Sequence, residues 1–408
     1  MELTQLNPSQ RVLFNQFADA VANYRQSEWI DDYLLKWLVA RDFDVQKAKD
    51  MLIQSIEWRQ IHQIDGILDN WTPPEVMKKY YAIGSVGSDK FGCPGKSFND
   101  IISQNTNRSN IIYFYDIVWI NAFGRMDMTG LLQSVSKRDY LRYVVYTTEM
   151  SHRQMHQNSI VTGKPVSYQT LVIDMAELSI NQLTKQFMDV GMELTRMILA
   201  NYPEGVRRVF VLNVPQIFST VFTFVKPFLS PVTLAKLSIF GHDSKMWKDA
   251  LLEEIDASQL PVHYGGTMTD PDGNPMCLTK ISMGGQVPKT YYLERKQSVP
   301  GDQMISDLIP AGKRKMIEIT IDEAKSFLRW EFVTEDGDIN FQLVYMRENG
   351  EEMLILPRDR YESHQLLEKG EIVCIYCGRY IMEFDNSYSY FRSKKLWYNI
   401  DVVKPMNR

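Results

Sequence analysis

The sequence predicts a multidomain protein in which a helical N-terminal region is followed by an α/β domain with a mostly parallel sheet and then by an antiparallel β-sandwich. Three patterns predict it: apolar residues at helical spacing within 1–72, short apolar runs alternating with long helical stretches within 75–266, and strict apolar–polar alternation within 278–404. A chain of 408 residues, 44% hydrophobic and 23% charged, has enough apolar material to bury more than one core.

The N-terminal region contains the stretch "DDYLLKWLVARDFDVQKAKDML". Asp31 and Asp32 favour a helix start, because carboxylates are stabilised by the helix dipole at that end. Asp44 is a good N-cap for a second helix that is expected to continue through Trp58. The segment "WTPPEV" then breaks the helical pattern and marks a linker.

The middle region alternates between strands and helices. Near-continuous apolar strands separated by helices are typical of a largely parallel sheet covered on both faces. The expected strands lie in 111–119, 168–175, 208–214 and 236–241, and the expected helices in 136–157 and 180–203. A polar segment at 96–110, rich in Asn and Ser, is expected to be either a looped-out insertion or an unspliced intron.

The C-terminal region alternates at period two. Trp330, Phe332 and Thr334 share one face of one run, while the next run places 339, 341, 343 and 345 on one face. The segment "EDGD" is a turn between the two runs. The pattern repeats further on, which predicts an antiparallel sandwich.

Several classes of function are disfavoured by composition and motifs. A net charge of −5 argues against general nucleic-acid binding. The chain has no GxSxG, HExxH, P-loop or GxGxxG motif, so we expect no catalytic residues, no cofactor and no metal, and not an enzyme. The "CIYC" pair lies on an expected strand, where residues three apart point to opposite faces. Only four cysteines and the lack of a signal-like start predict a cytoplasmic protein.

One apolar segment, "VFTFVKPFLSPVTLAKLSIFG", is unusual in such a chain. Six of its first nine residues are large and apolar, Pro227 lies among these nine, and Pro231 follows closely. Lys226 interrupts it, so it is too short to span a bilayer. It is either a buried core helix or a lid that covers an apolar ligand.

Longer stretches of sequence resemble known families. "LLKWLVARDFDVQKAKDML", "NYPEGVRRVFVLNVPQIFSTVFTFVKPFLSPVTLAKLSIFG" and "LPVHYGGTMTDPDGNP" resemble the CRAL-TRIO lipid-transfer family. "WEFVTEDGDINFQLVY" and "FDNSYSYFRSKKLWYNIDV" resemble the GOLD domain. Together they resemble the supernatant protein factor, or tocopherol-associated, type of phosphatidylinositol-transfer-like protein.

The resemblance implies a lipid pocket in the α/β domain, closed by a gate helix in the 217–236 region. In the closed state the gate covers the lipid chains, and in the open state it rests in the membrane interface, with the two prolines as hinge or end points. The implied gate and pocket residues are Phe218, Phe222, Phe224, Val225, Phe228 and Leu229.

The resemblance also implies a headgroup site, formed by Glu204, Thr233, Lys236 and Arg41. Glu204 accepts from inositol hydroxyls in this hypothesis, and Lys236 and Thr233 bind the phosphate. The alternative is that all four are solvated surface residues.

The implied pocket strand carries Gln169, Leu171 and Ile173. Choline-lipid binding in the family uses hydroxyl side chains at the positions of Gln169 and Leu171, so phosphatidylcholine is disfavoured. Phosphatidylinositol and an apolar ligand such as tocopherol or squalene remain.

Two functions follow from the resemblance. The first is non-enzymatic transfer of a lipid between membranes, with transient contact to a membrane surface of the Golgi or endoplasmic reticulum. The second is a lipid-sensing regulatory or scaffold protein that recruits a protein partner through the GOLD domain. In that domain Arg392, Lys394 and Lys395 form either a cationic edge for anionic headgroups or a solvated strand edge.

Overall fold

The structure is a computed structural model of residues 1–408. It describes residues 3–26, 29–90, 117–163, 166–179, 182–216, 218, 222–223, 226–293 and 303–405. The chain divides into two compact units, one of Met1–Ile53 with Leu68–Tyr292 and one of Gln54–Ile67 with Leu293–Arg408. The segment 96–110 and the two gate residues Phe224 and Val225 lie outside the described residues. The domain bounds expected from the sequence stay predictions.

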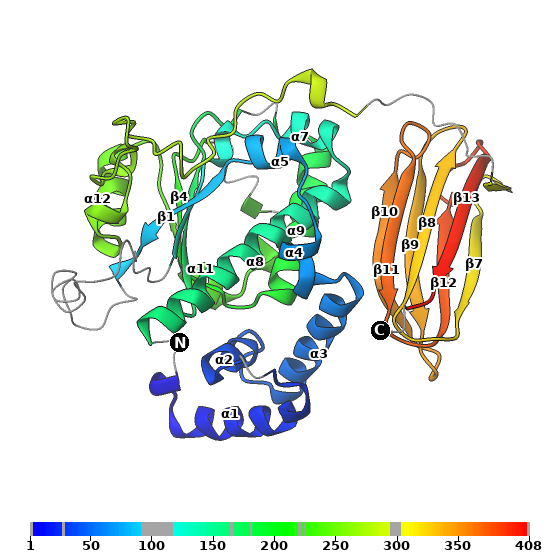
Figure 1. Ribbon diagram of the computed structural model, residues 1–408, viewed down its shortest axis with the longest axis horizontal. Coiled ribbons are helices and arrows are strands. Elements are labelled where there is room, and N and C mark those ends of the chain that lie inside the picture. Colours follow the sequence, from blue (N-terminus) through cyan, green and yellow to red (C-terminus); the bar gives the residue numbers. More distant parts are fainter. Residues whose placement is uncertain are drawn as a thin grey trace. The chain divides into compact units, whose positions relative to one another are not determined.

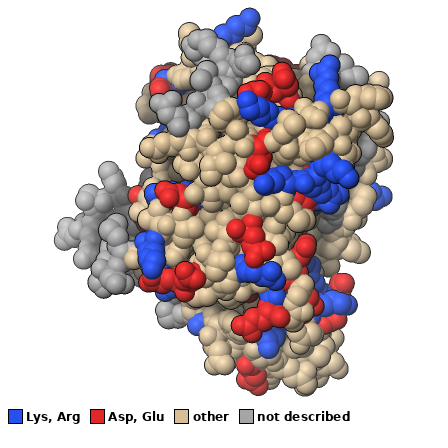
Figure 2. All heavy atoms as spheres, turned by 90° about the vertical axis from the view of Figure 1, so that its right-hand side faces the viewer, with Lys and Arg blue, Asp and Glu red and all other residues tan. Residues whose placement is uncertain are grey.

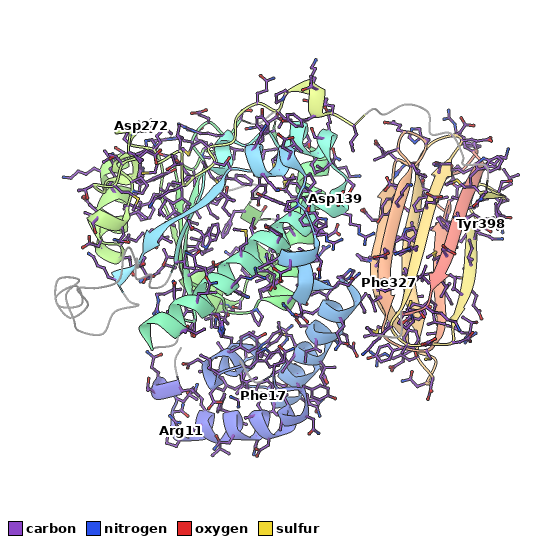
Figure 3. All side chains as sticks on the ribbon, in the orientation of Figure 1. Arg11, Phe17, Asp139, Asp272, Phe327 and Tyr398 are labelled. Carbon is purple, nitrogen blue, oxygen red and sulfur yellow. The ribbon has the colours of Figure 1, made fainter. Side chains whose placement is uncertain are left out.

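The first unit begins with the helices α1 (Pro8–Ala20) and α2 (Asp31–Val39) and the start of α3 (Val45–Ile61) (Figure 1). The predicted cap of α3 is confirmed, since the Asp44 carboxylate accepts from the backbone N–H of Lys47 at 3.0 Å. Phe17 of α1 is fully buried in this helical part of the unit (Figure 3).

The same unit holds a five-stranded sheet in the order β1-β2-β3-β4-β5. The three pairs from β2 to β5 are parallel and β1 is antiparallel to β2, so the mostly parallel sheet is confirmed. The strands are β1 (Ile83–Ser88), β2 (Ile117–Asn121), β3 (Gln169–Asp174), β4 (Val206–Leu212) and β5 (Leu237–Ile239). The helices of this part are α4 (Ile67–Asn70), α5 (Glu75–Tyr80), α7 (Met128–Ser134), α8 (Lys137–Thr162), α9 (Lys185–Asn201), α11 (Pro231–Ala235) and α12 (Ser244–Glu254).

Helices cover both faces of this sheet (Figure 1). On one face Val172 and Phe210 pack in a buried cluster with Trp247 of α12. On the other face Trp119 packs with Met155 of α8. Because successive residues of a strand point to opposite sides, the two clusters use alternate positions. The strands therefore have two distinct faces, which differ in how completely they are covered.

The second unit contains two four-stranded antiparallel sheets, β10-β9-β12-β7 and β11-β8-β13-β6. Their inner faces share one core, in which the rings of Phe332, Phe341 and Phe384 lie 5.0 to 5.1 Å apart. The strands are β6 (Ile305–Ile309), β7 (Arg314–Ile321), β8 (Ser326–Thr334), β9 (Ile339–Met346), β10 (Glu352–Tyr361), β11 (Glu368–Cys374), β12 (Gly378–Asp385) and β13 (Lys394–Val403). The predicted sandwich is confirmed.

One turn of the sandwich differs from a simple hairpin. The segment "EDGD" joins β8 to β9, but β8 pairs with β11 and β13, whereas β9 pairs with β10 and β12. The turn therefore crosses from one sheet to the other. Both strands still direct their apolar residues into the shared core. The alternation of apolar and polar residues therefore predicts which face of each strand is buried, but it does not predict which strands pair with each other.

A half-buried carboxylate holds this crossing turn. Asp338 accepts from Lys394 at 2.8 Å and from the hydroxyl of Tyr388 at 2.8 Å, and it also pairs with Arg360. Burial opposes the ionised form of Asp338, but these hydrogen bonds outweigh it and hold the pKa of the carboxyl well below its usual range. Lys394 is itself buried, so its charge depends on this partner.

We therefore expect Asp338→Asn to lower the free energy of unfolding by about 3 kcal/mol at neutral pH, because it leaves the ammonium of Lys394 buried without a counter-charge. Because the pKa of Asp338 is lower in the folded than in the unfolded chain, its carboxylate stabilises the fold at pH values above 3.8, the pKa in the unfolded chain. This stabilisation is lost as the pH falls towards the lower pKa of the folded chain. Urea unfolding at several pH values should thus show the difference from the unaltered chain shrinking below about pH 4. A difference that is constant from neutral to acid pH would contradict the assignment.

Candidate functional site

The central strand β3 is covered unequally on its two faces. Thr170, Val172 and Asp174 are buried, whereas the alternating residues Gln169, Leu171 and Ile173 are only half-buried. A central strand of a sheet with helices on both faces is normally buried on both sides. We call the side of the sheet that bears Leu171 and Ile173 the open face. Its incomplete cover leaves apolar surface at the middle of the domain.

The open face extends across neighbouring strands. Leu171 is in register with Trp119 on β2 and with Val209 on β4, and Leu237 of β5 is in register with Val209. Trp119 and Val209 are buried, while Leu237 is half-buried. Cover of the open face is therefore nearly complete at Trp119 and Val209 and incomplete at Leu171 and Leu237.

Polar side chains gather where β3, β4 and β5 begin. Gln169 opens β3, and its backbone N–H donates to the carbonyl of Gly205 at 3.1 Å, just before β4. Glu204 precedes that glycine, and Lys236 immediately precedes β5. We call Gln169, Glu204, Thr233 and Lys236 the polar edge. It borders the open face, so polar and apolar surfaces meet there.

Lys236 and Glu204 form an ion pair at the polar edge, with 16% and 9% of their side chains exposed. Thr233 lies one turn before Lys236, and its hydroxyl is 2.9 Å from that of Ser230, the N-cap of α11. Glu204 has a φ of 51°, in the left-handed region that is costly for a residue with a side chain. The local fold thus holds the carboxylate against Lys236 at a conformational cost.

Arg41 is the one residue of the predicted headgroup set that this grouping does not include. It follows α2, and its guanidinium donates to the carbonyl of Ala40 at 3.0 Å. Among the described contacts the structure brings together Glu204 and Lys236, with Thr233 close in the chain, but not Arg41 with them.

A hydrogen-bonded chain at the other end of the polar edge was not foreseen from the sequence. The indole N–H of Trp119 donates to the hydroxyl of Ser151 on α8 at 3.0 Å, and that hydroxyl donates to the side-chain oxygen of Gln169 at 2.6 Å. Ser151 and Trp119 lie on other elements than Gln169, so no sequence signal links the three. The chain fixes the amide of Gln169 beside the open face.

The expected gate segment is partly described. The rings of Phe218 and Phe222 stack with centroids 5.5 Å apart, as one helical turn allows, and both are half-buried. Lys226–Phe228 form a 3₁₀ turn and Pro231 begins α11, so Pro227 lies within the turn and Pro231 at a helix start. Leu229 between them is half-buried. The side chain of Phe228, with Phe224 and Val225, lies outside the described residues.

The described residues contain no group of three or more His, Cys, Asp or Glu side chains placed to hold a metal ion. Within "CIYC", Cys374 is buried and the thiol of Cys377 lies 3.4 Å from the carbonyl of Asp322. In the part of the chain that is described, no helix is both long and apolar enough to cross a membrane. Groups of Lys and Arg are interspersed with Asp and Glu over the described part of the face that Figure 2 shows.

Residues 115–266 match the family model of the CRAL/TRIO domain. The Caenorhabditis elegans protein ctg-1 is 26% identical to this chain over 381 residues, which cover 91% of both proteins. A crystal structure of Sfh5 matches with 17% identity and a TM-score of 0.49, covering 66% of this chain and 90% of that one. The N-terminal cellulose-binding domain of β-1,4-glucanase C from Cellulomonas fimi matches with 9% identity and a TM-score of 0.20, covering 26% of this chain and 80% of that one. At such TM-scores neither structural likeness bears on function.

Proposed function

We propose that this chain, which carries a CRAL/TRIO domain at residues 115–266, is a non-enzymatic carrier that binds one lipid and transfers it between membranes. Lipid binding is the general property of this domain family. The single observation that carries the proposal for this chain is the half-buried face of the central strand, at Leu171 and Ile173, beside the polar edge. A molecule with an apolar body and a polar end is complementary to such a site.

The polar edge supports a phosphate-bearing headgroup as one ligand. Lys236 is a point charge that suits a phosphodiester, and Glu204 is an acceptor for hydroxyl groups. The two side chains neutralise one another in this structure. A phosphatidylinositol headgroup would supply both an anion for Lys236 and hydroxyl donors for Glu204, so neither group would be left buried without a partner.

The open face supports an apolar ligand as well. Leu171 and Ile173 offer only carbon, and the oxygen of Gln169 already accepts from Ser151. This disfavours a choline headgroup at the strand and favours tocopherol, squalene or a similar isoprenoid as the second ligand. Phe218, Phe222 and Leu229, with Phe224, Val225 and Phe228, are proposed to form the gate over these chains.

Energetics explain why a carrier needs a gate that works at a membrane. Each methylene removed from water contributes about 0.8 kcal/mol, so a two-chain lipid cannot leave into water at a useful rate. Exchange therefore takes place at a bilayer, and covalent chemistry is not required. We further propose a GOLD identity for the sandwich, the supernatant protein factor type for the whole chain, and a cytoplasmic location with transient contact to Golgi or endoplasmic reticulum membranes.

A transfer assay between donor and acceptor vesicles tests the proposal, with labelled phosphatidylinositol and labelled tocopherol measured in parallel. A carrier moves many lipid molecules per protein molecule. Transfer that stops after one lipid per protein would contradict the carrier and favour a lipid-sensing scaffold, which binds once and recruits a partner through the sandwich.

The double variant Lys236→Met with Glu204→Gln tests the polar edge in the same assay. It removes both charges together, so neither is left buried alone. We expect phosphatidylinositol transfer to fall by about tenfold or more, since charge-assisted hydrogen bonds to the phosphate are lost, and tocopherol transfer to persist. Lys245→Ala, on the exposed side of α12, is the control and should leave both unchanged. An equal decrease in the transfer of phosphatidylinositol and of tocopherol would contradict the headgroup assignment.

A further inference from the structure

Two aromatic side chains project from the loop between β12 and β13. Tyr390 is 88% exposed and Phe391 is 97% exposed, and their ring centroids lie 6.4 Å apart. Consecutive aromatic residues with so little contact to their own protein keep a large apolar surface in water. We call these two residues the aromatic tip.

The base of this loop is firmly held. Asn386 is fully buried, and its side-chain amide donates to the carbonyls of Ile309 at 3.2 Å and Arg392 at 2.9 Å. The hydroxyl of Tyr388 donates to the carboxylate of Asp338 at 2.8 Å. The loop is thus tied to its neighbours on both sides of the aromatic tip, and its backbone presents these two rings outward.

Two exposed cations lie on this loop and at its base. Arg392 directly follows the aromatic tip, and Lys313 lies at the base of the loop, where its carbonyl accepts from the N–H of Asn386 at 3.0 Å. The cationic edge expected from the sequence is corrected here. Lys394 is buried against Asp338, and Lys395 pairs with Glu335 at 2.8 Å, so of the three only Arg392 offers its charge outward in the described structure.

We propose that the aromatic tip is a membrane-contact element of the sandwich, and that its occupant is the interfacial region of a bilayer containing anionic lipid. Aromatic rings are favoured at the level of the headgroups, and cations near the surface are attracted by anionic lipids. Arg392 next to Phe391, and Lys313 at the base of the same loop, provide that charge complementarity. The loop also contains the small residues Ser387, Ser389 and Ser393, so the two rings can enter the interface without burying a broad surface.

This inference goes beyond the proposed carrier function, because it requires no lipid in the CRAL/TRIO domain. It assigns to the second unit a role of its own, which is to hold the chain at a membrane surface. The carrier function and the membrane contact can therefore fail separately, and the experiment below keeps them apart.

Co-sedimentation of the full chain with vesicles tests the proposal, using phosphatidylcholine alone and phosphatidylcholine mixed with phosphatidylserine. We expect Tyr390→Ala with Phe391→Ala to weaken binding to the mixed vesicles by about tenfold or more, from the loss of two interfacial aromatics. The matched control is Met316→Ala with Leu354→Ala, which removes apolar side chains that are 59% and 57% exposed on β7 and β10 of the same unit. That control should bind as the unaltered chain does.

The charge component is tested with Arg392→Ala and Lys313→Ala together, which should abolish the preference for phosphatidylserine while leaving residual binding. Thermal unfolding of each variant checks that the sandwich remains folded. Unchanged vesicle binding by the aromatic variant would overturn the proposal and would leave a protein partner as the occupant of the tip. A loss of equal size in the Met316 and Leu354 control would overturn it as well.

Lipid occupancy separates the two hypotheses. The aromatic variant should still carry lipid after extraction and mass spectrometry, whereas the Lys236 and Glu204 variant should still sediment with vesicles. A chain that sediments but never carries lipid would refute the carrier function and leave the membrane-contact element in place.

Discussion

Replacing both Leu171 and Ile173 by Trp is expected to abolish lipid carriage while the protein stays folded. Both side chains are half-buried on the open face, so two indoles can occupy the volume that the lipid chains are proposed to take. The lipid recovered per protein, measured by organic extraction and mass spectrometry, should fall by about tenfold or more, since the lipid would lose several methylenes of burial. The melting temperature should change little.

The control for this variant keeps apolar volume nearly constant, as Leu171→Met with Ile173→Met, and should retain lipid. If the space is already filled by protein, the Trp variant will instead be overpacked and destabilised by roughly 1 to 3 kcal/mol. Normal lipid content in a folded Trp variant would contradict the assignment of the open face as the lipid site.

Asp174→Ala is expected to produce the largest loss of stability in the first unit, about 4 kcal/mol, because three donors lose their acceptor at a buried site. The carboxylate accepts from the backbone N–H of Ala176 at 3.0 Å, from the side chain of Asn213 at 2.7 Å and from the hydroxyl of Tyr264 at 3.2 Å. The pKa of Tyr264 lies far above its usual range, mainly because the hydroxyl is buried and also because the charge of Asp174 is near. This hydroxyl therefore remains a donor.

Urea unfolding followed by circular dichroism measures the effect. Tyr264→Phe is the matched control, since it removes one of the three donors and leaves the other two in place, and it should cost only about 1 kcal/mol. If Asp174→Ala lowers the free energy of unfolding by less than Tyr264→Phe does, water replaces the carboxylate and the site is not a closed network.

Much of the fold follows from local patterns. The cap at Asp44, the parallel strands β2 to β5 and the inward residues of β8 and β9 were all predicted from spacing and side-chain type. The strand β1 was not, because "IGSVGS" has little β-branched or apolar character. Its glycines serve close packing instead: a Cβ at Gly84 would lie 2.1 Å from the carbonyl oxygen of Lys280. Such contacts between distant segments leave no periodic signal.

Part of the candidate site was likewise predicted from the sequence, and part was not. The resemblance to a family singled out Glu204 and Lys236, and the structure pairs them. The link from Gln169 through Ser151 to Trp119, and the network at Asp174, depend on side chains from different elements. Spacing along the chain cannot reveal such contacts, because they arise only when the sheet and its helices assemble. The burial of Lys394, in a run of basic residues, was hidden for the same reason.

The most direct test of lipid carriage is native mass spectrometry of the intact chain after incubation with mixed eukaryotic membranes, followed by extraction and identification of what is bound. The account predicts one lipid per chain, with phosphatidylinositol, tocopherol or squalene as the bound species, and loss of that adduct in the Leu171 and Ile173 Trp variant. A folded chain that emerges without any lipid adduct, under conditions that preserve non-covalent complexes, would contradict it.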